Sequence, residues 1–196
     1  MIKRIFDATA AAVGLTLVAP LFAVIALAIK LGSAGPVFFR QERMGQDFRP
    51  FRIYKFRTMV ADAPKLGGQI TAGADPRITS VGRILRKSKL DELPQLINVL
   101  AGDMSLVGPR PEVPRYVELF RDDYRTVLSV RPGITDLASV KYRDENELLG
   151  GAADPDRVYI EQILPDKIAL AKEYIARQSL IYDIGLILQT LLKIVK

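Results

Sequence analysis

The stretch Ser88–Pro111, SKLDELPQLINVLAGDMSLVGPRP, decides the fold prediction because it holds a helix start, a helix end and a rigid turn in 24 residues. The acid pair Asp91 and Glu92 stands at the first turn of a predicted short helix. Pro94 fits this position, since a proline near a helix start gives up an N–H that has no intrahelical partner. Apolar residues then recur at helical spacing and predict a face that fixes the helix on a core: Leu93, Leu96, Ile97 and Leu100.

The chain after this helix predicts a short strand, Met104–Val107, and a stiff loop, Gly108–Pro111. Helix N-termini favour anions, so the predicted helix would keep Asp91 ionised. The preceding segment Pro76–Leu90 has no acid. Its basic residues are Arg77, Arg83, Arg86, Lys87 and Lys89. Two adjacent acids that face a basic run and the rigid Arg110 suit phosphate chemistry.

Each of these features also has an ordinary explanation. Asp91 would serve as a helix N-cap, which is the commonest role of aspartate at a helix start. Glu92 would be a solvated acid of the first turn, and Arg110 a surface ion-pair partner. These explanations fit the residues one at a time, whereas the combination favours a functional site.

Composition excludes several kinds of catalysis. The 196 residues include no cysteine and no histidine, and they predict one domain with an appended membrane element. This composition excludes thiol nucleophiles, histidine bases, Ser-His-Asp triads and Cys/His zinc sites. The formal net charge of +6 predicts an anionic partner: nucleic acid, anionic lipid or a phosphorylated substrate.

Residues 8–29, ATAAAVGLTLVAPLFAVIALAI, carry no charge and are long enough to cross a hydrocarbon layer roughly 30 Å thick. Basic residues flank the run on both sides, whereas a simple span shows them mainly on one. Pro20 deletes a helix hydrogen bond near the middle and predicts a kink. These observations favour a re-entrant helix that enters and leaves by the cytoplasmic face. A straight transmembrane anchor, a signal peptide and a buried soluble helix are the alternatives.

The next part of the chain predicts a hairpin of two strands, Val37–Phe39 and Phe51–Met59, around Gly45. Six basic residues and interleaved aromatics between 40 and 57 suit either nucleic acid or lipid headgroups and a nucleotide diphosphate, and the membrane run favours the second pair. Val60–Pro76 is predicted to be a loop, either a lid over substrate or disordered. Ile78–Lys87 predicts an amphipathic helix.

Towards the C-terminus the pattern predicts a polar helix at Pro114–Arg125, a turn at 131–135 that presents Arg131, and a strand at Asp136–Tyr142. An exposed acidic loop is expected at 144–156 and a polar helix at 166–178. Ser179 would cap a last apolar helix. That helix would pack on the core, lie in the membrane interface or form a homodimer contact.

The chain resembles the bacterial sugar transferases called monotopic phosphoglycosyl transferases, in their small form. The likeness covers nearly the whole chain and is carried by KRIFD, FRIYKFRTM, DPRITSVGRILRKSKLDELPQLINVLAGDMSLVGPRP, RPGIT and SLIYDIGLILQT. LDELPQL followed by GDMSLVGPRP is the specific signature. One stretch departs from the family pattern RPGITGLAQVNGR, because Asp136, Ser139 and Lys141 replace Gly, Gln and Asn. This departure weakens any inference about the sugar that is bound.

The resemblance implies transfer of a sugar 1-phosphate from a UDP-sugar to polyprenyl (undecaprenyl) phosphate, with release of UMP, as the first membrane step of bacterial glycoconjugate or exopolysaccharide assembly. Asp91 would be the covalent nucleophile and a ligand of Mg²⁺, and Glu92 would assist. The expected substrate-binding residues are Lys55, Arg86, Arg110, Pro111 and Arg131.

The expected fold is α/β, mostly helical and irregular, with a small sheet, a re-entrant membrane helix and interfacial amphipathic helices. Residues 1–31 would form the membrane helix and 32–196 a catalytic domain on the cytoplasmic face of the bacterial inner membrane. The partners would be the UDP-sugar, the polyprenyl phosphate and the bilayer, with no nucleic acid. A basic membrane-surface scaffold and a membrane-tethered nucleic-acid-binding protein are the alternatives.

Overall fold

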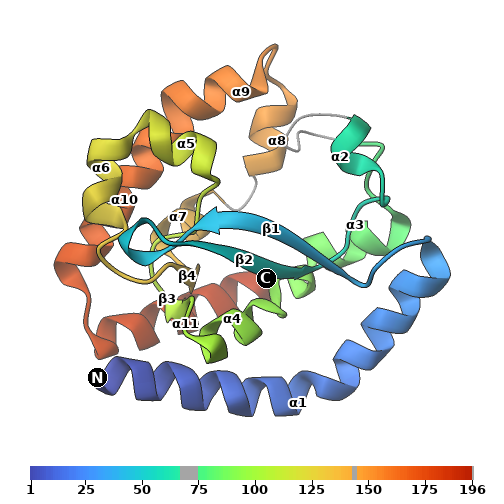
Figure 1. The fold of residues 1–196 in the computed structure, drawn as a ribbon, viewed down its shortest axis with the longest axis horizontal. Helices are drawn as coiled ribbons and strands as arrows, with labels where there is room; N and C mark the ends of the chain where they lie inside the picture. The colour runs from blue at the N-terminus through green and yellow to red at the C-terminus, as the bar shows by residue number, and fades with distance from the viewer. Residues whose placement is uncertain (67–74, 143–144, 196) are drawn as a thin grey trace.

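The computed structural model describes residues 1–66, 75–142 and 145–195. Helix α1 (Ile2–Gly32) runs along one edge of the molecule and bends part of the way along its length (Figure 1). Pro20 lies inside this helix, and a proline there accounts for a bend because it removes one backbone hydrogen bond. The expected long apolar helix is therefore confirmed, whereas its path through a membrane stays a prediction.

One face of α1 packs on the rest of the chain and the other is exposed. Ala11 packs against Ile53 and Val99, and Ile29 packs with Phe56. The exposed face carries large apolar side chains along its length: Val13, Leu17, Leu21, Val24, Leu27 and Leu31. By length and composition α1 could cross a membrane. Of the residues in its most apolar 18-residue stretch, 11% are buried within the protein.

Buried polar contacts hold the N-terminal end of α1. The ammonium of Lys3 lies 2.5 Å from a carboxylate oxygen of Asp183 and donates to the carbonyl of Val107 at 3.1 Å. Asp7 accepts a hydrogen bond of 2.7 Å from the hydroxyl of Ser105. Residues from opposite ends of the sequence therefore fix this end of the helix.

Arg57 holds the other end. Its guanidinium donates to the carbonyls of Ser33 and Ala34, and to the Ser33 hydroxyl at 2.9 Å. These carbonyls follow the last turn of α1, where a cation also meets the negative end of the helix dipole. Arg57 is 5% exposed, so this member of the predicted basic run serves the fold.

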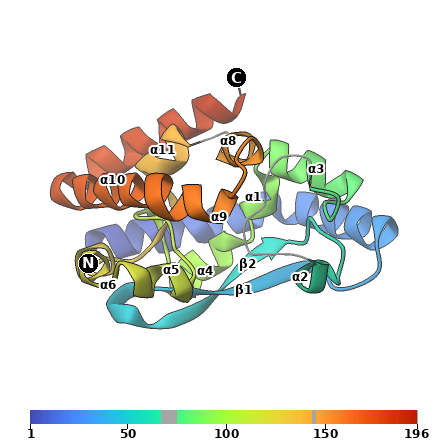
Figure 2. The ribbon, with the colours of Figure 1, turned by 90° about the horizontal axis from the view of Figure 1, so that it is seen from above.

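Strands β1 (Phe38–Met44) and β2 (Pro50–Phe56) form the predicted hairpin, with Phe38 opposite Phe56 and Met44 opposite Pro50. β1 extends further than expected. The connection is correspondingly shorter, a single 3₁₀ turn at Gln46–Phe48 with Asp47 and Phe48 at positive φ. In Figure 2 the hairpin lies on one side of the molecule and α10 and α11 on the other.

The loop predicted at Val60–Pro76 instead contains a short helix, α2 (Ala63–Leu66), and its part 67–74 lies outside the described residues. Helix α3 (Ser80–Lys87) confirms the predicted helix, and the side chain of Thr79 caps it by accepting from Gly82 N at 2.9 Å. A Cβ at Gly82 would lie 2.0 Å from the carbonyl oxygen of Thr58, so this close crossing requires glycine.

The helix that was predicted to begin at the acid pair is α4 (Gln95–Ala101), with Pro94 as its N-cap. Asp91 and Glu92 lie before it, in a separate 3₁₀ turn, Leu90–Glu92, that follows Lys89 at φ 58°. The prediction was wrong at this boundary: Lys89 starts the 3₁₀ turn, and α4 begins only after Pro94, which has no N–H to continue the hydrogen bonds of that turn. Asp91 does not cap α4.

Strand β3 (Ser105–Val107) confirms the predicted strand and pairs in parallel with β4 (Gly133–Thr135), where only a turn was expected. The strand predicted at 136–142 is wrong. This segment forms helix α7 (Leu137–Lys141), because the Asp136 carboxylate accepts from Ser139 N and starts a helix. The small sheet is thus two separate pairs of strands.

The remaining elements are helices. The polar helix predicted at Pro114–Arg125 forms as two helices, α5 (Pro114–Leu119) and α6 (Arg121–Val127), with a break at Phe120. The expected acidic loop instead contains α8 (Glu145–Gly150) and α9 (Pro155–Val158). A π-helical turn at Tyr159–Ile163 leads into α10 (Leu164–Arg177), and α11 (Leu180–Val195) begins at the predicted Ser179 cap.

Candidate active site

Glu92 lies between two cations. Nζ of Lys55, on β2, donates to Oε1 of Glu92 at 2.7 Å. The guanidinium of Arg110 donates to both carboxylate oxygens, with Nη1 3.3 Å from Oε2. Burial alone would raise the pKa of Glu92, but the charges and hydrogen bonds of Arg110 and Lys55 hold it well below its usual range. Glu92 is therefore a fixed anion.

Asp91 has no such partners. It is 8% exposed, and within the described parts of the chain its side chain has neither a hydrogen bond nor an ion pair. Burial raises its pKa; the Lys55 charge opposes this shift and the Glu92 charge adds to it. The two neighbouring carboxylates therefore differ: one is neutralised by contacts, and the other keeps its oxygens available to a ligand.

The loop that carries Arg110 is fixed by β3 and β4. Gly108 N donates to the Thr135 carbonyl at 3.1 Å, and Gly133 N donates to the Pro109 carbonyl at 2.9 Å. A Cβ on Gly133 would lie 2.0 Å from Gly108 N, so the two backbones touch. This contact explains why a glycine stands at each position.

The same loop is held from the hairpin side. Nη1 of Arg43 donates to the Pro111 carbonyl at 3.2 Å, and Met44 N donates to the Glu112 carbonyl at 2.9 Å. Arg110 therefore projects from a backbone that is bonded on both flanks, as expected for a group that must meet a substrate in one geometry.

Arg86 stands at the end of α3. Its Nε donates to the hydroxyl of Thr58 at 2.9 Å, and burial lowers its pKa, with the Asp91 charge opposing the shift. The expected helix 78–87 thus brings a cation close to the acid pair.

A cavity of about 1060 Å³ collects these groups between the hairpin and the C-terminal helices. Six of the seven residues predicted for the site line it: Lys55, Arg86, Asp91, Glu92, Arg110 and Pro111. Arg131 does not. Its side chain is exposed and its Nε donates to the Gly102 carbonyl at 2.9 Å, behind the loop that carries Arg110.

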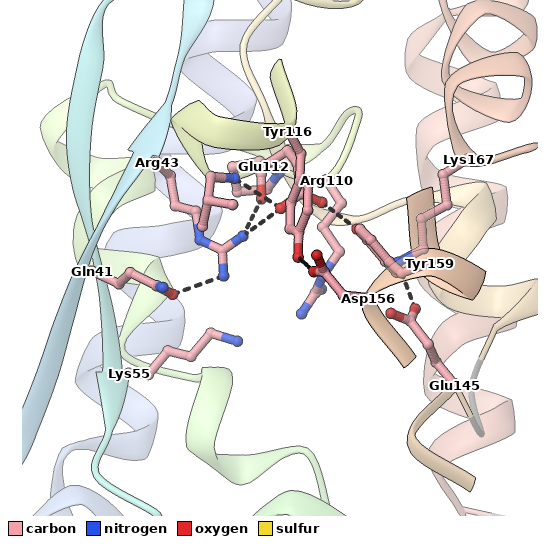
Figure 3. A network of polar contacts seen from close by, with 12 residues as sticks. Gln41, Arg43, Lys55, Arg110, Glu112, Tyr116, Glu145, Asp156, Tyr159 and Lys167 are labelled. Carbon is pink, nitrogen blue, oxygen red and sulfur yellow. Dashed lines mark hydrogen bonds and ion pairs between the residues drawn. The ribbon is translucent and has the colours of Figure 1, made fainter. Parts of the chain in front are cut away.

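A second polar network, which the sequence did not predict, forms another wall of the cavity (Figure 3). Nη1 of Arg43 lies 3.0 Å from Oε1 of Glu112, and the Tyr159 hydroxyl donates to the other oxygen of Glu112. Nζ of Lys167 lies 2.5 Å from Glu145. Only the position of Glu112 directly after Pro-Arg-Pro signals this wall in the sequence, because the other members are distant and sit in ordinary helical patterns.

No cluster of three acids suited to a metal occurs among the described residues. Beside the cations, Asp91 offers a carboxylate with no described hydrogen bond or ion pair, whereas Glu92 is held by Lys55 and Arg110. One carboxylate together with substrate phosphates fits the usual coordination of Mg²⁺. The residues therefore fit a metal that arrives with a diphosphate.

Comparison with known proteins places the chain among sugar transferases. It is 42% identical over 195 residues to the UDP-N-acetylgalactosamine-undecaprenyl-phosphate N-acetylgalactosaminephosphotransferase of Aeromonas hydrophila, covering 97% of this chain and 43% of that protein. It is 39% identical over 198 residues to the UDP-glucose:undecaprenyl-phosphate glucose-1-phosphate transferase of Escherichia coli K12, covering 98% and 40%.

A protein of the same name from Caulobacter vibrioides is 43% identical over 193 residues, covering 96% of this chain and 67% of the relative. The chain thus spans less than half the length of the first two relatives and about two thirds of the third. The family model described as "Bacterial sugar transferase" matches residues 1–196. The chain therefore belongs to the bacterial sugar transferase family.

Proposed function

We propose that the protein transfers a sugar 1-phosphate from a UDP-sugar to undecaprenyl phosphate through a covalent intermediate on Asp91. The observation that carries the proposal is the contrast within the acid pair: Asp91 is buried and has no described partner, while Glu92 is neutralised by Lys55 and Arg110. The names of the relatives support the donor and acceptor classes.

In the first step an oxygen of Asp91 attacks the β-phosphorus of the donor. The bond from this phosphorus to the oxygen that bridges the two phosphates breaks, and UMP leaves with that oxygen. In the second step a phosphate oxygen of the lipid attacks the same phosphorus and releases the Asp91 carboxylate. The product is the lipid diphosphate sugar, and the scheme is ping-pong.

The surrounding cations lower the barrier by meeting phosphate charge, which dominates phosphoryl transfer. Arg110 has a planar fork that suits two phosphate oxygens, and Lys55 and Arg86 line the same cavity. Glu92 acts by orienting Lys55 and Arg110. Asp91 would hold Mg²⁺ together with the diphosphate, and the metal would supply further neutralisation of charge.

The acceptor is a membrane lipid, and α1 provides the membrane element. Lys3 and Arg57 fix its two ends to the same domain, and apolar side chains cover its exposed face. This arrangement favours a re-entrant helix, with the rest of the chain on the cytoplasmic face of the inner membrane. We propose the division at residue 31 on the same ground.

The names of the relatives include two sugars, N-acetylgalactosamine and glucose, and one relative from Rhizobium leguminosarum is named an exopolysaccharide production protein. We propose a role in exopolysaccharide or lipopolysaccharide assembly and leave the sugar to experiment. A non-enzymatic scaffold would explain the charge and α1 but would give the Asp91 geometry no role.

The test is UMP release by the purified protein in lipid nanodiscs from UDP-glucose, UDP-galactose and their N-acetylamino counterparts, with Mg²⁺ and undecaprenyl phosphate. Release with at least one donor, lost on chelation and in Asp91→Asn, supports the proposal. Turnover retained in Asp91→Asn would exclude the covalent role of Asp91.

A further inference from the structure

The cavity has two chemically different regions. Around Asp91 its lining is rich in cations, among them Lys55, Arg86 and Lys89. Beyond Arg110, towards α8 and α10, the lining includes the carboxylates of Glu112 and Glu145. Phosphates are attracted to the first region, whereas in the second Glu112 pairs with Arg43 and Glu145 with Lys167, so the charges there balance. The charged part of a donor therefore belongs at one end, and the second region suits a polar group without charge.

The second region is held rigid by its own contacts (Figure 3). Arg43 bridges two side chains, with Nη1 3.0 Å from Glu112 Oε1 and Nη2 donating to Gln41 Oε1 at 2.8 Å. The ammonium of Lys167 lies 2.5 Å from Glu145 Oε2 and 4.8 Å from the centre of the Tyr159 ring. Such contacts fix rotamers before a ligand arrives.

This wall keeps hydrogen-bonding capacity for a ligand. Among the described residues, the side-chain NH₂ of Gln41 and Oε1 of Glu145 have no partner. The hydroxyl of Ser139 lies 3.5 Å from Nη1 of Arg110 and lines the same cavity. Donors and acceptors that line one cavity match the hydroxyl groups of a sugar, because each hydroxyl both donates and accepts.

We infer that three residues of this region, Gln41, Ser139 and Glu145, bind the sugar of the donor and select among sugars. Arg43 and Lys167 of the wall hold Gln41 and Glu145 in place. The inference rests on the proposed function, in which the sugar stays bonded to the β-phosphate that Asp91 attacks. Arg110 joins the two regions, since it contacts Glu92 on one side and Ser139 on the other. A sugar on that phosphate therefore extends past Arg110 onto the wall.

The volume is consistent with this division. A cavity of about 1060 Å³ lies at the upper end of the range for small-molecule sites, roughly 300–1,000 Å³, so a diphosphate alone would leave most of it empty. The substitution of Ser for the family's usual Gln at 139 then changes a residue of the selecting wall.

The experiment measures binding rather than turnover. In the Asp91→Asn protein, which holds donors without reacting, dissociation constants are measured by calorimetry for UMP and for UDP-glucose, UDP-galactose, UDP-N-acetylglucosamine and UDP-N-acetylgalactosamine. Gln41→Leu and Glu145→Gln are added separately. We expect each substitution to reduce the ratio of dissociation constants between the weakest- and tightest-binding UDP-sugars by about tenfold, the usual effect of one lost hydrogen bond in a site. The dissociation constant of UMP should change less than about twofold.

Glu161→Gln is the matched control, because Glu161 pairs with Arg157 in an exposed position and does not line the cavity. Equal weakening of UMP and of every donor would overturn the inference in favour of a nucleoside site, and an unchanged sugar preference would overturn it outright. A variant counts as folded if its thermal unfolding midpoint matches that of Glu161→Gln. One folded variant, Gln41→Leu or Glu145→Gln, is enough to test the inference. Failure of the proposed function appears differently, as turnover by the Asp91→Asn protein or as no donor binding at all.

Discussion

Nζ of Lys55 lies 2.7 Å from Oε1 of Glu92, whereas Asp91, the preceding residue, has no comparable partner among the described residues. Two carboxylates joined by one peptide bond thus occupy different electrostatic environments. Environments that separate the pKa values of paired acids commonly separate their roles. This contrast supports the proposal that Glu92 holds the cations in place and Asp91 reacts.

Removing the Glu92 charge should disturb both activity and stability. In Glu92→Gln the partly buried Lys55 and Arg110 lose their anion, so we expect about a 100-fold loss of turnover and a loss of about 2 kcal/mol in the free energy of unfolding. Steady-state kinetics and denaturant unfolding measure the two effects. Glu118→Gln, which removes an exposed pair with Arg121, is the control and should change neither. Wild-type activity in Glu92→Gln would contradict the assigned role.

The contributions of Glu92 and Asp91 to stability should change in opposite directions with pH. The pKa of Glu92 is lowered in the folded state, so its stabilising contribution is present above its ordinary value of 4.5 and is lost as the pH falls through the lower folded value. The pKa of Asp91 is raised, so its ionisation costs stability as the pH rises past 3.8.

Asp91→Asn should therefore be more stable than the wild type at neutral pH and lose this advantage in acid. Unfolding midpoints recorded between pH 3 and 7 (about four pH values suffice) test the sign. A variant less stable than the wild type at pH 7 would show that Asp91 has a stabilising partner after all.

The crossing of Gly133 over Gly108 should be sensitive to one methyl group. In Gly133→Ala the new Cβ would lie 2.0 Å from Gly108 N, so we expect a loss of about 2 kcal/mol or more and displacement of the Arg110 loop. Gly185→Ala is the control, because nothing lies within 4 Å of its Cβ and α11 should gain about 0.5–1 kcal/mol. Thermal unfolding of the two variants should shift in opposite directions, and equal shifts would contradict the close crossing.

The absence of native cysteine allows a clean test of the path of α1. Single cysteines at Ile2 and Leu31, both exposed at opposite ends of the helix, should both resist a maleimide confined to the periplasm and both react after permeabilisation. Asp122→Cys, on the exposed surface of α6, marks the side on which the rest of the chain lies. Labelling of Ile2→Cys from the periplasm would instead indicate a straight span.

Local signals predicted much of the fold. Ser179 starts the last helix where a cap was expected, the predicted helix 78–87 forms with Thr79 as its cap, and the two predicted hairpin strands pair. The prediction of a strand at 136–142 was wrong because the capping bond of Asp136 starts a helix there. The break after Glu92 was missed because Pro94 was placed inside the first turn of one helix, whereas it is the N-cap of α4.

The site was predictable where its residues are neighbours in sequence. Asp91, Glu92 and Arg110 stand in one signature, and Lys55 and Arg86 came from the family resemblance. The wall of Arg43, Tyr159 and Lys167 was not predictable, because those residues meet only through the tertiary fold. Arg131 was expected in the site by its resemblance to the Arg110 turn, yet its guanidinium bonds the end of α4.

In the proposed reaction Asp91 becomes covalently bonded to the phosphosugar. The most direct measurement is intact-protein mass spectrometry after incubation with the preferred UDP-sugar and Mg²⁺ but without lipid acceptor. We predict an added mass equal to the sugar phosphate, located on the peptide that contains Asp91, lost on addition of undecaprenyl phosphate and absent from Asp91→Asn. An adduct at another residue, or full turnover by Asp91→Asn, would contradict the account.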